Sequence, residues 1–225
     1  MSETTGTNLS TRGLTKVFGG VRAVDGADVT FHDGKINALI GPNGSGKTTF
    51  FNCVTGMIKP DSGTVTFRGR QITGRSPHVI AHAGIGRSFQ LCRIFPRMTV
   101  LDNVLVAVRR TRIRELLAPA RTEEEVAKAR ELLVRVGIDH LEDSEARDLS
   151  YGQQKLLELA GVLMGDPDTI MLDEPAGGVN PSLIGRIGSL VKELNAEGTT
   201  FLIVEHNMDL VMSLSHHVVV FDRGR

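Results

Sequence analysis

The sequence predicts an α/β fold with an all-helical piece inserted in its middle. Short apolar runs, typical of strands covered on both faces, recur along the chain, and helical patterns separate them. Between about residues 99 and 148 only helical patterns occur. A glycine-rich loop joins one apolar run to a helix, which is the arrangement of a phosphate-binding α/β protein.

The strand and helix patterns can be assigned in order. Strands are expected at residues 8–15, 28–31, 36–40, 64–67, 84–89, 169–173, 200–204 and 218–222. Helices are expected at residues 48–56, 123–136, 156–163, 183–195 and 209–215. The clearest of these is 123–136, because Thr122 and Glu125 form a capping box before it and Gly137 ends it.

Composition narrows the class of protein. The 225 residues carry 26 basic and 26 acidic side chains, so the formal net charge is zero and a protein that coats nucleic acid is not indicated. No apolar run reaches the roughly 18 residues of a membrane span, and residues 1–7 lack the apolar core of a signal peptide, so a non-secreted protein is expected. Only Cys53 and Cys92 are present, which excludes a disulfide framework and a cysteine zinc site.

The first chemical motif is a phosphate loop. The run Gly-Pro-Asn-Gly-Ser-Gly-Lys-Thr from Gly41 to Thr48 matches G-x-x-x-x-G-K-[ST], directly after one apolar strand and before a helix. Glycines let successive backbone N–H groups face one anion, and the helix N-terminus adds its positive dipole end. Lys47 is expected on the β- and γ-phosphates and the Thr48 hydroxyl on Mg²⁺. The alternative is a chance glycine-rich turn.

The second motif ends the apolar run 169–173 with two adjacent carboxylates. Asp173 is expected to hold Mg²⁺ through a water, and Glu174 to polarise the attacking water. Alone, a strand that ends in Asp-Glu is often just a solvated edge. The phosphate loop makes the pair its expected acidic companion.

The third motif is Leu149-Ser150-Tyr151-Gly152-Gln153. Ser150 and Gln153 form an S-x-x-Q capping box before an apolar helix, and many proteins have one without any ligand. The same capped helix N-terminus is also an anion site. One chain does not need a second anion site for one nucleotide, but two chains facing head to tail would give each nucleotide one phosphate loop and one such helix.

Three single residues complete the set. Gln90 ends a strand, where it could reach Mg²⁺ or the attacking water, or be a polar strand end. His206 follows another strand, where it could donate to the γ-phosphate or be a surface residue. Phe18 stands before two glycines, where it could stack on adenine or anchor a loop.

The order of these features resembles ATP-binding-cassette (ABC) ATPases over essentially the whole chain. The Leu-Ser-x-Gly-Gln signature is specific to that family among phosphate-loop proteins. The resemblance implies an α/β fold: a phosphate-loop (RecA-like) ABC ATPase core with a mixed β-sheet, an antiparallel β subdomain and an inserted α-helical subdomain. It implies a single domain over residues 1–225, with the core in 1–90 and 150–225 and the helical subdomain in 91–149.

The resemblance also implies roles for the motif residues, with ATP sandwiched between two subunits. Phe18 is expected to stack on adenine, and Thr48, Gln90 and Asp173 to serve Mg²⁺. Glu174 is expected to be the catalytic base, with His206 and Gln90 as further catalytic residues. The residues expected on the phosphates are Gly41, Pro42, Asn43, Gly44, Ser45, Gly46, Lys47, Thr48 and Thr49 of one subunit and Ser150, Gly152 and Gln153 of the other.

A narrower resemblance is to the ATP-binding subunits of bacterial branched-chain amino-acid importers. It rests on residues 14–20, 86–99, 149–154, 174–181 and 204–208. It implies a subunit that hydrolyses ATP to power a membrane importer for branched-chain or related amino acids. The implied partners are integral permease subunits, a second ABC ATPase (a sister chain or a second copy) and, indirectly, a solute-binding protein, with no nucleic acid. The implied location is peripheral, on the cytoplasmic face of the inner (plasma) membrane.

Other functions remain open at this stage. The chain could serve an importer of another small polar solute, such as urea or an amide. A soluble ABC ATPase of DNA repair or translation would usually carry two cassettes, long coiled-coil insertions or basic tails, and none is visible. A phosphate-loop kinase would leave residues 149–153 unexplained.

Three features depart from the family pattern or extend it. Asn180 stands where most cassettes carry Asp, which removes a charge from the expected dimer seam. The sequence ends at Arg225, where relatives usually continue, so residues 218–222 are expected to form an open edge. Between Arg87 and Arg114 there are seven arginines and one acid, Asp102, which indicates either a solvated basic face or a docking face for the permease or anionic lipid.

Overall fold

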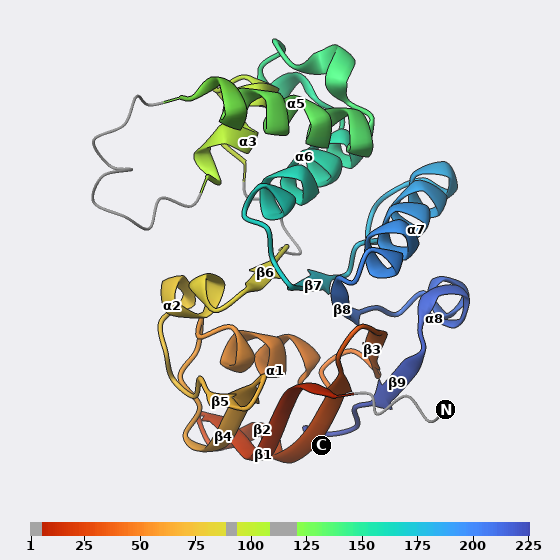
Figure 1. Ribbon diagram of the computed structural model, residues 1–225. Coiled ribbons are helices and arrows are strands. Elements are labelled where there is room, and N and C mark those ends of the chain that lie inside the picture. The colour runs from red at the N-terminus through yellow and green to blue at the C-terminus, as the bar shows by residue number, and fades with distance from the viewer. Residues whose placement is uncertain (1–5, 89–93, 109–120) are drawn as a thin grey trace, which may run out of the picture. The chain divides into compact units, whose positions relative to one another are not determined.

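The computed structural model describes residues 6–88, 94–108 and 121–225 (Figure 1). The chain divides into two compact units. The first, here the sheet unit, contains Met1–Arg87, Asp168–Glu174 and Val191–Arg225. The second, here the helical unit, contains Ser88–Pro167 and Pro175–Leu190.

A parallel sheet forms one half of the sheet unit. Its strand order is β6-β7-β8-β3-β9. The strands are β3 (Ile36–Ile40), β6 (Ile85–Arg87), β7 (Thr169–Asp173), β8 (Thr200–Val204) and β9 (His217–Val220). Every residue of β7 and β8 is buried, as the continuous apolar runs predict. β9 forms one edge of this sheet among the described residues.

An antiparallel sheet forms the other half of the sheet unit, with the order β2-β1-β4-β5. Its strands are β1 (Thr7–Phe18), β2 (Val21–His32), β4 (Ser62–Phe67) and β5 (Arg70–Gln71). The parallel and antiparallel strands therefore lie in two separate sheets. Alternation along β2 buries Val29 and Phe31 and exposes Asp28 and Thr30, as a sheet with one covered face requires.

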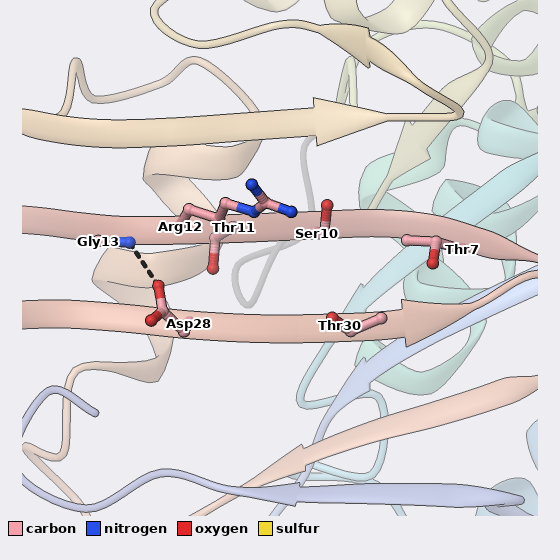
Figure 2. A pocket seen from close by; sticks show the side chains of 7 residues that line it. All are labelled: Thr7, Ser10, Thr11, Arg12, Gly13, Asp28 and Thr30. Atoms are coloured by element: carbon pink, nitrogen blue, oxygen red, sulfur yellow. Dashed lines mark hydrogen bonds between the residues drawn. The ribbon is translucent and has the colours of Figure 1, made fainter.

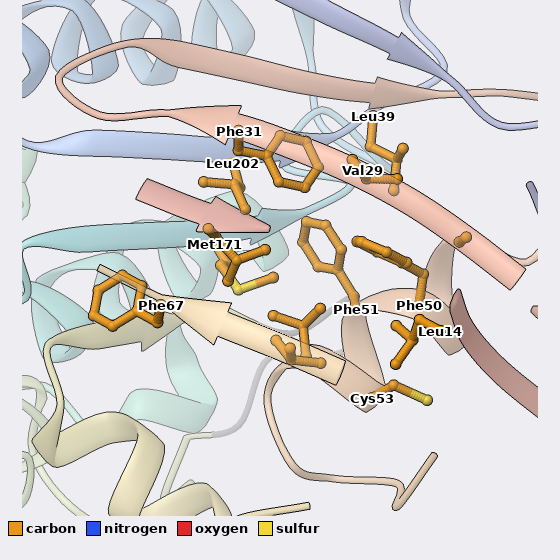
Figure 3. Close-up of a cluster of buried hydrophobic side chains, with 14 of the residues drawn as sticks. Leu14, Val29, Phe31, Leu39, Phe50, Phe51, Cys53, Phe67, Met171 and Leu202 are labelled. Carbon is orange, nitrogen blue, oxygen red and sulfur yellow. The ribbon is translucent and has the colours of Figure 1, made fainter. Parts of the chain in front are cut away.

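Helix α1 (Lys47–Val54) supplies the side chains that join the two sheets. Phe50 meets Phe31 of β2 edge to face, with ring centroids 6.2 Å apart, and meets Phe221 in the same way at 5.3 Å. Met171 and Leu202 of the parallel sheet belong to the same buried cluster (Figure 3). One apolar core therefore fixes α1, and with it the loop that precedes α1.

Cys53 lies in this cluster and is 1% exposed. Burial raises the pKa of its thiol to about 11, so the sulfur stays a neutral apolar group. A buried free cysteine of this kind packs as a small apolar side chain. The second cysteine, Cys92, lies outside the described residues.

The helical unit is built around α3 (Val100–Val106), α5 (Glu123–Val136) and α6 (Tyr151–Met164). All three helices pack on one another. Both expected capping boxes form, at Thr122 and Glu125 and at Ser150 and Gln153. By its contacts α6 belongs to the helical unit, whereas the expected division of the chain assigned the residues from 150 onward to the ATPase core. The apolar face of α6 is shared with α3 and α5, which is why its contacts lie here.

The remaining elements complete the fold. They are α2 (Pro77–His82), α7 (Pro181–Ala196), α8 (Met208–Leu214) and 3-10 turns at Asp139–Leu141 and Ala146–Asp148. α7 belongs to the helical unit up to Leu190 and to the sheet unit from Val191 onward. Within the three described stretches, no helix combines the length and the apolar character that a membrane crossing needs.

Candidate nucleotide-binding site

The phosphate loop lies between the end of β3 and the start of α1, where the sequence predicts it. Gly46 precedes α1 with φ of 99°, a left-handed value that favours glycine. A Cβ on Gly46 would lie 2.0 Å from the carbonyl oxygen of Ala23, and one on Gly41 would lie 2.1 Å from that of Phe221. Neighbouring backbone thus leaves no room for a side chain at either position.

The last turn of the sequence supports this loop. Gly224 N–H donates to the carbonyl of Ser45 at 2.9 Å, and Asp25 N–H donates to the carbonyl of Gly224 at 2.8 Å. The turn therefore ties the phosphate loop to β2 through backbone alone. Among the described residues β9 is an edge strand, and the residues that follow β9 pack against the phosphate loop.

Lys47 is folded over the loop. Its ammonium donates to the carbonyls of Gly41 and Pro42, both at 2.8 Å, and the residue is only 7% exposed. A buried ammonium needs acceptors, and these two carbonyls satisfy part of that need. The positive charge is thereby held against the loop backbone that the sequence predicts to bind phosphates.

A cavity of about 190 Å³ brings the loop and one acidic residue together. It is lined by Ala23, Asn43, Gly44, Gly46, Lys47, Thr48, Thr49 and Glu174. Glu174 and the loop are more than a hundred residues apart in the sequence. Their meeting follows from the register of neighbouring parallel strands, whose carboxyl ends share one edge of the sheet.

Glu174 has an unusual backbone conformation. Its φ is 50°, in the left-handed region that non-glycine residues rarely occupy. Its N–H donates to the carbonyl of Val204 at 2.9 Å, which ties it to the end of β8. Backbone strain of this kind concentrates at functional sites because the surrounding structure must be built to hold it.

Asp173 is buried beside Glu174 and is paired with Arg87, for which the sequence predicted only a place at the start of a basic surface segment. Arg87 Nη2 donates to Asp173 Oδ2 at 3.0 Å, and the two side chains are 8% and 3% exposed. The other carboxylate oxygen, Oδ1, is buried and has no hydrogen-bond partner in the described parts of the chain. The signal in the sequence is a single arginine at the end of a short strand, β6, whose other two residues are buried.

His206 follows β8 and is held by its neighbour. Its imidazole is 60% exposed, while Glu205 is fully buried. Glu205 Oε2 accepts from the N–H groups of His206 and Asn207 at 2.8 and 2.9 Å. No sequence motif marks Glu205, although a buried carboxylate at the end of an apolar strand needs internal donors.

Of two further expected residues, one does not line the cavity and the other lies outside the described residues. Phe18 ends β1, is 46% exposed, and is not among the residues that line the cavity. The ammonium of Lys16 lies 5.4 Å from its ring centroid. Gln90 lies outside the described residues. Their expected roles stay predictions.

The signature residues form a separate cluster in the helical unit. Ser150 N–H donates to Gln153 Oε1 at 2.9 Å, and Gln153 N–H donates to Ser150 Oγ at 3.4 Å. Gly152 packs against α7, since a Cβ there would lie 2.4 Å from Leu183 Cδ2. A cavity of about 740 Å³ opens here, with Asn180 and other helical-unit residues in its lining.

Asn180 begins α7. Its Oδ1 accepts from the N–H of Leu183 at 2.9 Å, which is the bond of a helix N-cap. Asn and Asp are about equally good N-caps, so the expected loss of a charge leaves this local structure intact.

A hollow of about 500 Å³ also lies on the antiparallel sheet (Figure 2). In it, Asp28 of β2 accepts a hydrogen bond from the N–H of Gly13 of β1. Its lining is mostly hydroxyl side chains and contains none of the motif residues. The residues that line it are Thr7, Ser10, Thr11, Arg12, Gly13, Asp28 and Thr30.

Comparison with known proteins gives the family. A family model described as ABC transporter matches residues 24–177, well over half of the chain. The chain belongs to the ABC transporter ATP-binding family. This is an ATPase family whose members couple hydrolysis to transport, and nucleotide binding is its common property.

Two curated relatives of this ABC protein cover almost the whole chain. A probable branched-chain amino acid transport ATP-binding protein LivG of Archaeoglobus fulgidus is 42% identical over 221 residues, which is 96% of this chain and 86% of the relative. The high-affinity branched-chain amino acid transport ATP-binding protein BraF of Pseudomonas aeruginosa is 41% identical over 225 residues, with 96% and 88% covered.

Solved ABC cassettes have the same fold. A nucleotide-free ATP-binding cassette from an ABC transporter matches with a TM-score of 0.87 at 38% identity, over 97% of this chain and 89% of that one. A cassette described as an ADP conformation matches with a TM-score of 0.86 at 39% identity, over 98% and 89%. The predicted α/β ABC ATPase fold is thereby confirmed.

Proposed function

We propose that this chain is the subunit of a membrane importer that binds and hydrolyses ATP, and that the importer carries branched-chain or related amino acids. The observation that carries the hydrolytic part is the cavity shared by the phosphate loop and Glu174. The transport part is supported by relatives about 40% identical whose names describe branched-chain amino acid transport.

The phosphate loop is the part that binds the triphosphate. Backbone N–H groups of the loop and the first turn of α1 face the β- and γ-phosphates, and Lys47 exchanges its two carbonyl acceptors for phosphate oxygens. Phe18 stacks on the adenine ring. Because Gly41 and Gly46 are packed against fixed backbone, the loop is formed before the nucleotide arrives.

Glu174 acts as the general base. Its carboxylate accepts a proton from the attacking water, and the strained backbone holds it toward the loop cavity. His206, fixed through the buried Glu205, contacts the γ-phosphate. Ser150, Gly152 and Gln153 act on the nucleotide bound to another ATPase subunit, because their cluster contains no phosphate loop of its own.

The residues present also fit a Mg²⁺ ion. Mg²⁺ takes oxygen ligands and is usually held by one or two carboxylates together with substrate phosphates and water. Asp173 offers a buried oxygen that has no hydrogen-bond partner within the described stretches, Thr48 offers a hydroxyl at the loop, and Gln90 is the third expected ligand. When bound, the ion would neutralise charge on the phosphates.

Membrane co-purification tests the importer. The tagged chain is expected to co-purify from gently solubilised native membranes with integral permease proteins and a second ABC ATPase. In proteoliposomes, this complex should take up leucine only with ATP, and a complex with Lys47→Ala should assemble without transport. Uptake of urea or an amide in place of leucine would move the proposal to another solute. Recovery of only nucleic-acid or ribosomal partners would overturn it.

A further inference from the structure

We propose that Arg87 positions the metal site of this ATPase, by tying the strand that carries Asp173 to the helix that carries Thr48. This inference rests on the proposed function, because it concerns the same metal site. It assigns a role to a residue that does not line the loop cavity and is not one of the expected metal ligands. Arg87 is therefore a positioning residue rather than a catalytic one.

Arg87 joins two elements through one guanidinium group. Its Nη2 donates to Asp173 Oδ2 at 3.0 Å, at the end of β7. Its Nη1 donates to Asn52 Oδ1 at 2.8 Å and to Thr55 Oγ1 at 2.6 Å, in and just after α1. The guanidinium carbon also lies 5.8 Å from the ring centroid of Phe51 of α1.

These contacts matter because the two expected metal ligands come from different elements. Thr48 lies in the first turn of α1, and Asp173 is the last residue of β7. The polar contacts of Arg87 join the end of β7 to the later part of α1, where Asn52 lies about one helical turn beyond Thr48. A metal ion with a strict octahedral geometry depends on the distance between these elements more than the phosphates do.

Arg87 also determines how the carboxylate of Asp173 is turned. The bond from the arginine to Oδ2 opposes rotation of the carboxylate, and Oδ1 is the oxygen without a hydrogen-bond partner among the residues that the structure describes. Because both side chains are buried, water does not replace this contact easily. The arginine thus holds one oxygen and leaves the other for the metal.

A lysine at position 87 cannot make the same set of contacts. A guanidinium presents its donors in a rigid plane, so that one group reaches acceptors on two elements at once. An ammonium on a flexible stem keeps the charge but loses the fixed fork. Charge compensation of Asp173 and positioning of Asp173 can therefore be separated by comparing Arg87→Lys with Arg87→Met.

The test measures metal binding rather than turnover. The full chain is loaded with a non-hydrolysable ATP analogue and titrated with Mn²⁺, with free Mn²⁺ followed by electron paramagnetic resonance. Loss of a partner that orients a metal ligand typically weakens metal binding by about 10- to 100-fold, which is the change expected for Arg87→Met. Arg87→Lys should give an intermediate loss. ATP affinity in EDTA should stay at the wild-type value, because the arginine does not contact the loop cavity.

Matched variants make the result decisive. Arg130→Met removes an exposed arginine that is paired with Glu142 in the helical unit. Mn²⁺ binding and ATP affinity of this variant should stay at their wild-type values. If Arg87→Met does not fold, Arg87→Lys and Thr55→Val carry the test, since each keeps the buried charge pair compensated. Unchanged Mn²⁺ binding in the folded Arg87 variants, with weakened binding in Asp173→Asn, would overturn this inference alone. Unchanged binding in Asp173→Asn as well would overturn the metal site of the proposed function with it.

Discussion

The two clusters of residues expected to contact ATP are built in different ways. In the sheet unit, contacts between distant parts of the chain shape the phosphate loop, as where Gly46 abuts the backbone of Ala23. In the helical unit, Ser150 and Gln153 hold each other within one helical turn, and Ser150 is exposed. One cluster depends on the tertiary fold, whereas the other is a local capping motif.

This difference bears on how the chain works. The described lining of the 190 Å³ loop cavity belongs entirely to the sheet unit, so that unit carries what binding of a triphosphate needs. The signature cluster offers polar groups and a helix N-terminus to a 740 Å³ cavity without a phosphate loop. We therefore expect nucleotide binding by the single chain, and use of Ser150 only when a second ATPase subunit is present.

The largest effect on ATP binding is expected from Gly46→Ala. The new methyl group would collide with the carbonyl of Ala23 at a backbone position that is already left-handed, so the loop must move. ATP affinity, measured by titration calorimetry, should fall by more than about tenfold, equivalent to about 1.4 kcal/mol. Gly20→Ala is the control, because its φ of 87° is also left-handed but nothing lies within 4 Å of the new methyl. Equal effects of the two changes would refute tertiary packing as the cause.

A smaller and more selective effect is expected from Ser150→Ala. Loss of the cap should cost about 1 kcal/mol of stability in thermal unfolding. ATP affinity of the single chain should not change, but ATP-dependent association with a second ATPase subunit, followed by analytical ultracentrifugation, should weaken. Thr122→Ala removes the matching capping box on α5 and should cost similar stability while sparing association. If both variants associate normally, Ser150 is only a helix cap.

The smallest effect is expected from His217, and it concerns pH. Burial lowers the pKa of His217 below its usual 6.5, and the nearby charge of His32 lowers it further. The ring centroids of the two histidines are 4.7 Å apart. The folded state therefore disfavours the charged form, and its contribution to stability is present above pH 6.5 and lost as the pH falls through the lowered pKa. His217→Gln should reduce the acid-dependent loss of stability in urea unfolding between pH 7 and 5. The exposed His140→Gln should leave that loss unchanged.

The sequence predicted the elements whose signals are local. The strands at residues 36–40, 169–173 and 200–204 and the helix at 123–136 form with the expected bounds, because continuous apolar runs and a complete capping box specify them. The two-residue strand β5 and the short helix α2 were not predicted. Elements that short depend on tertiary contacts more than on any periodic pattern.

The same distinction applies to the site. Motif spacing predicted the phosphate loop and Glu174, and both line one cavity. Arg87 and Glu205 were missed as supporting residues, because their significance depends on burial and on hydrogen bonds between elements. The backing of the loop by Gly224 was missed for the same reason, since no local pattern marks a backbone contact across the chain.

The most direct test of the account is the ATP turnover of Glu174→Gln measured together with its ATP affinity. The substitution removes the proposed base and keeps the phosphate loop, so affinity should be retained while turnover falls by about 100-fold or more. Glu131→Gln, an exposed acid of the helical unit, should leave both quantities at the wild-type value. Near-normal hydrolysis by Glu174→Gln would contradict the claim that the cavity shared by the phosphate loop and Glu174 is the hydrolytic site.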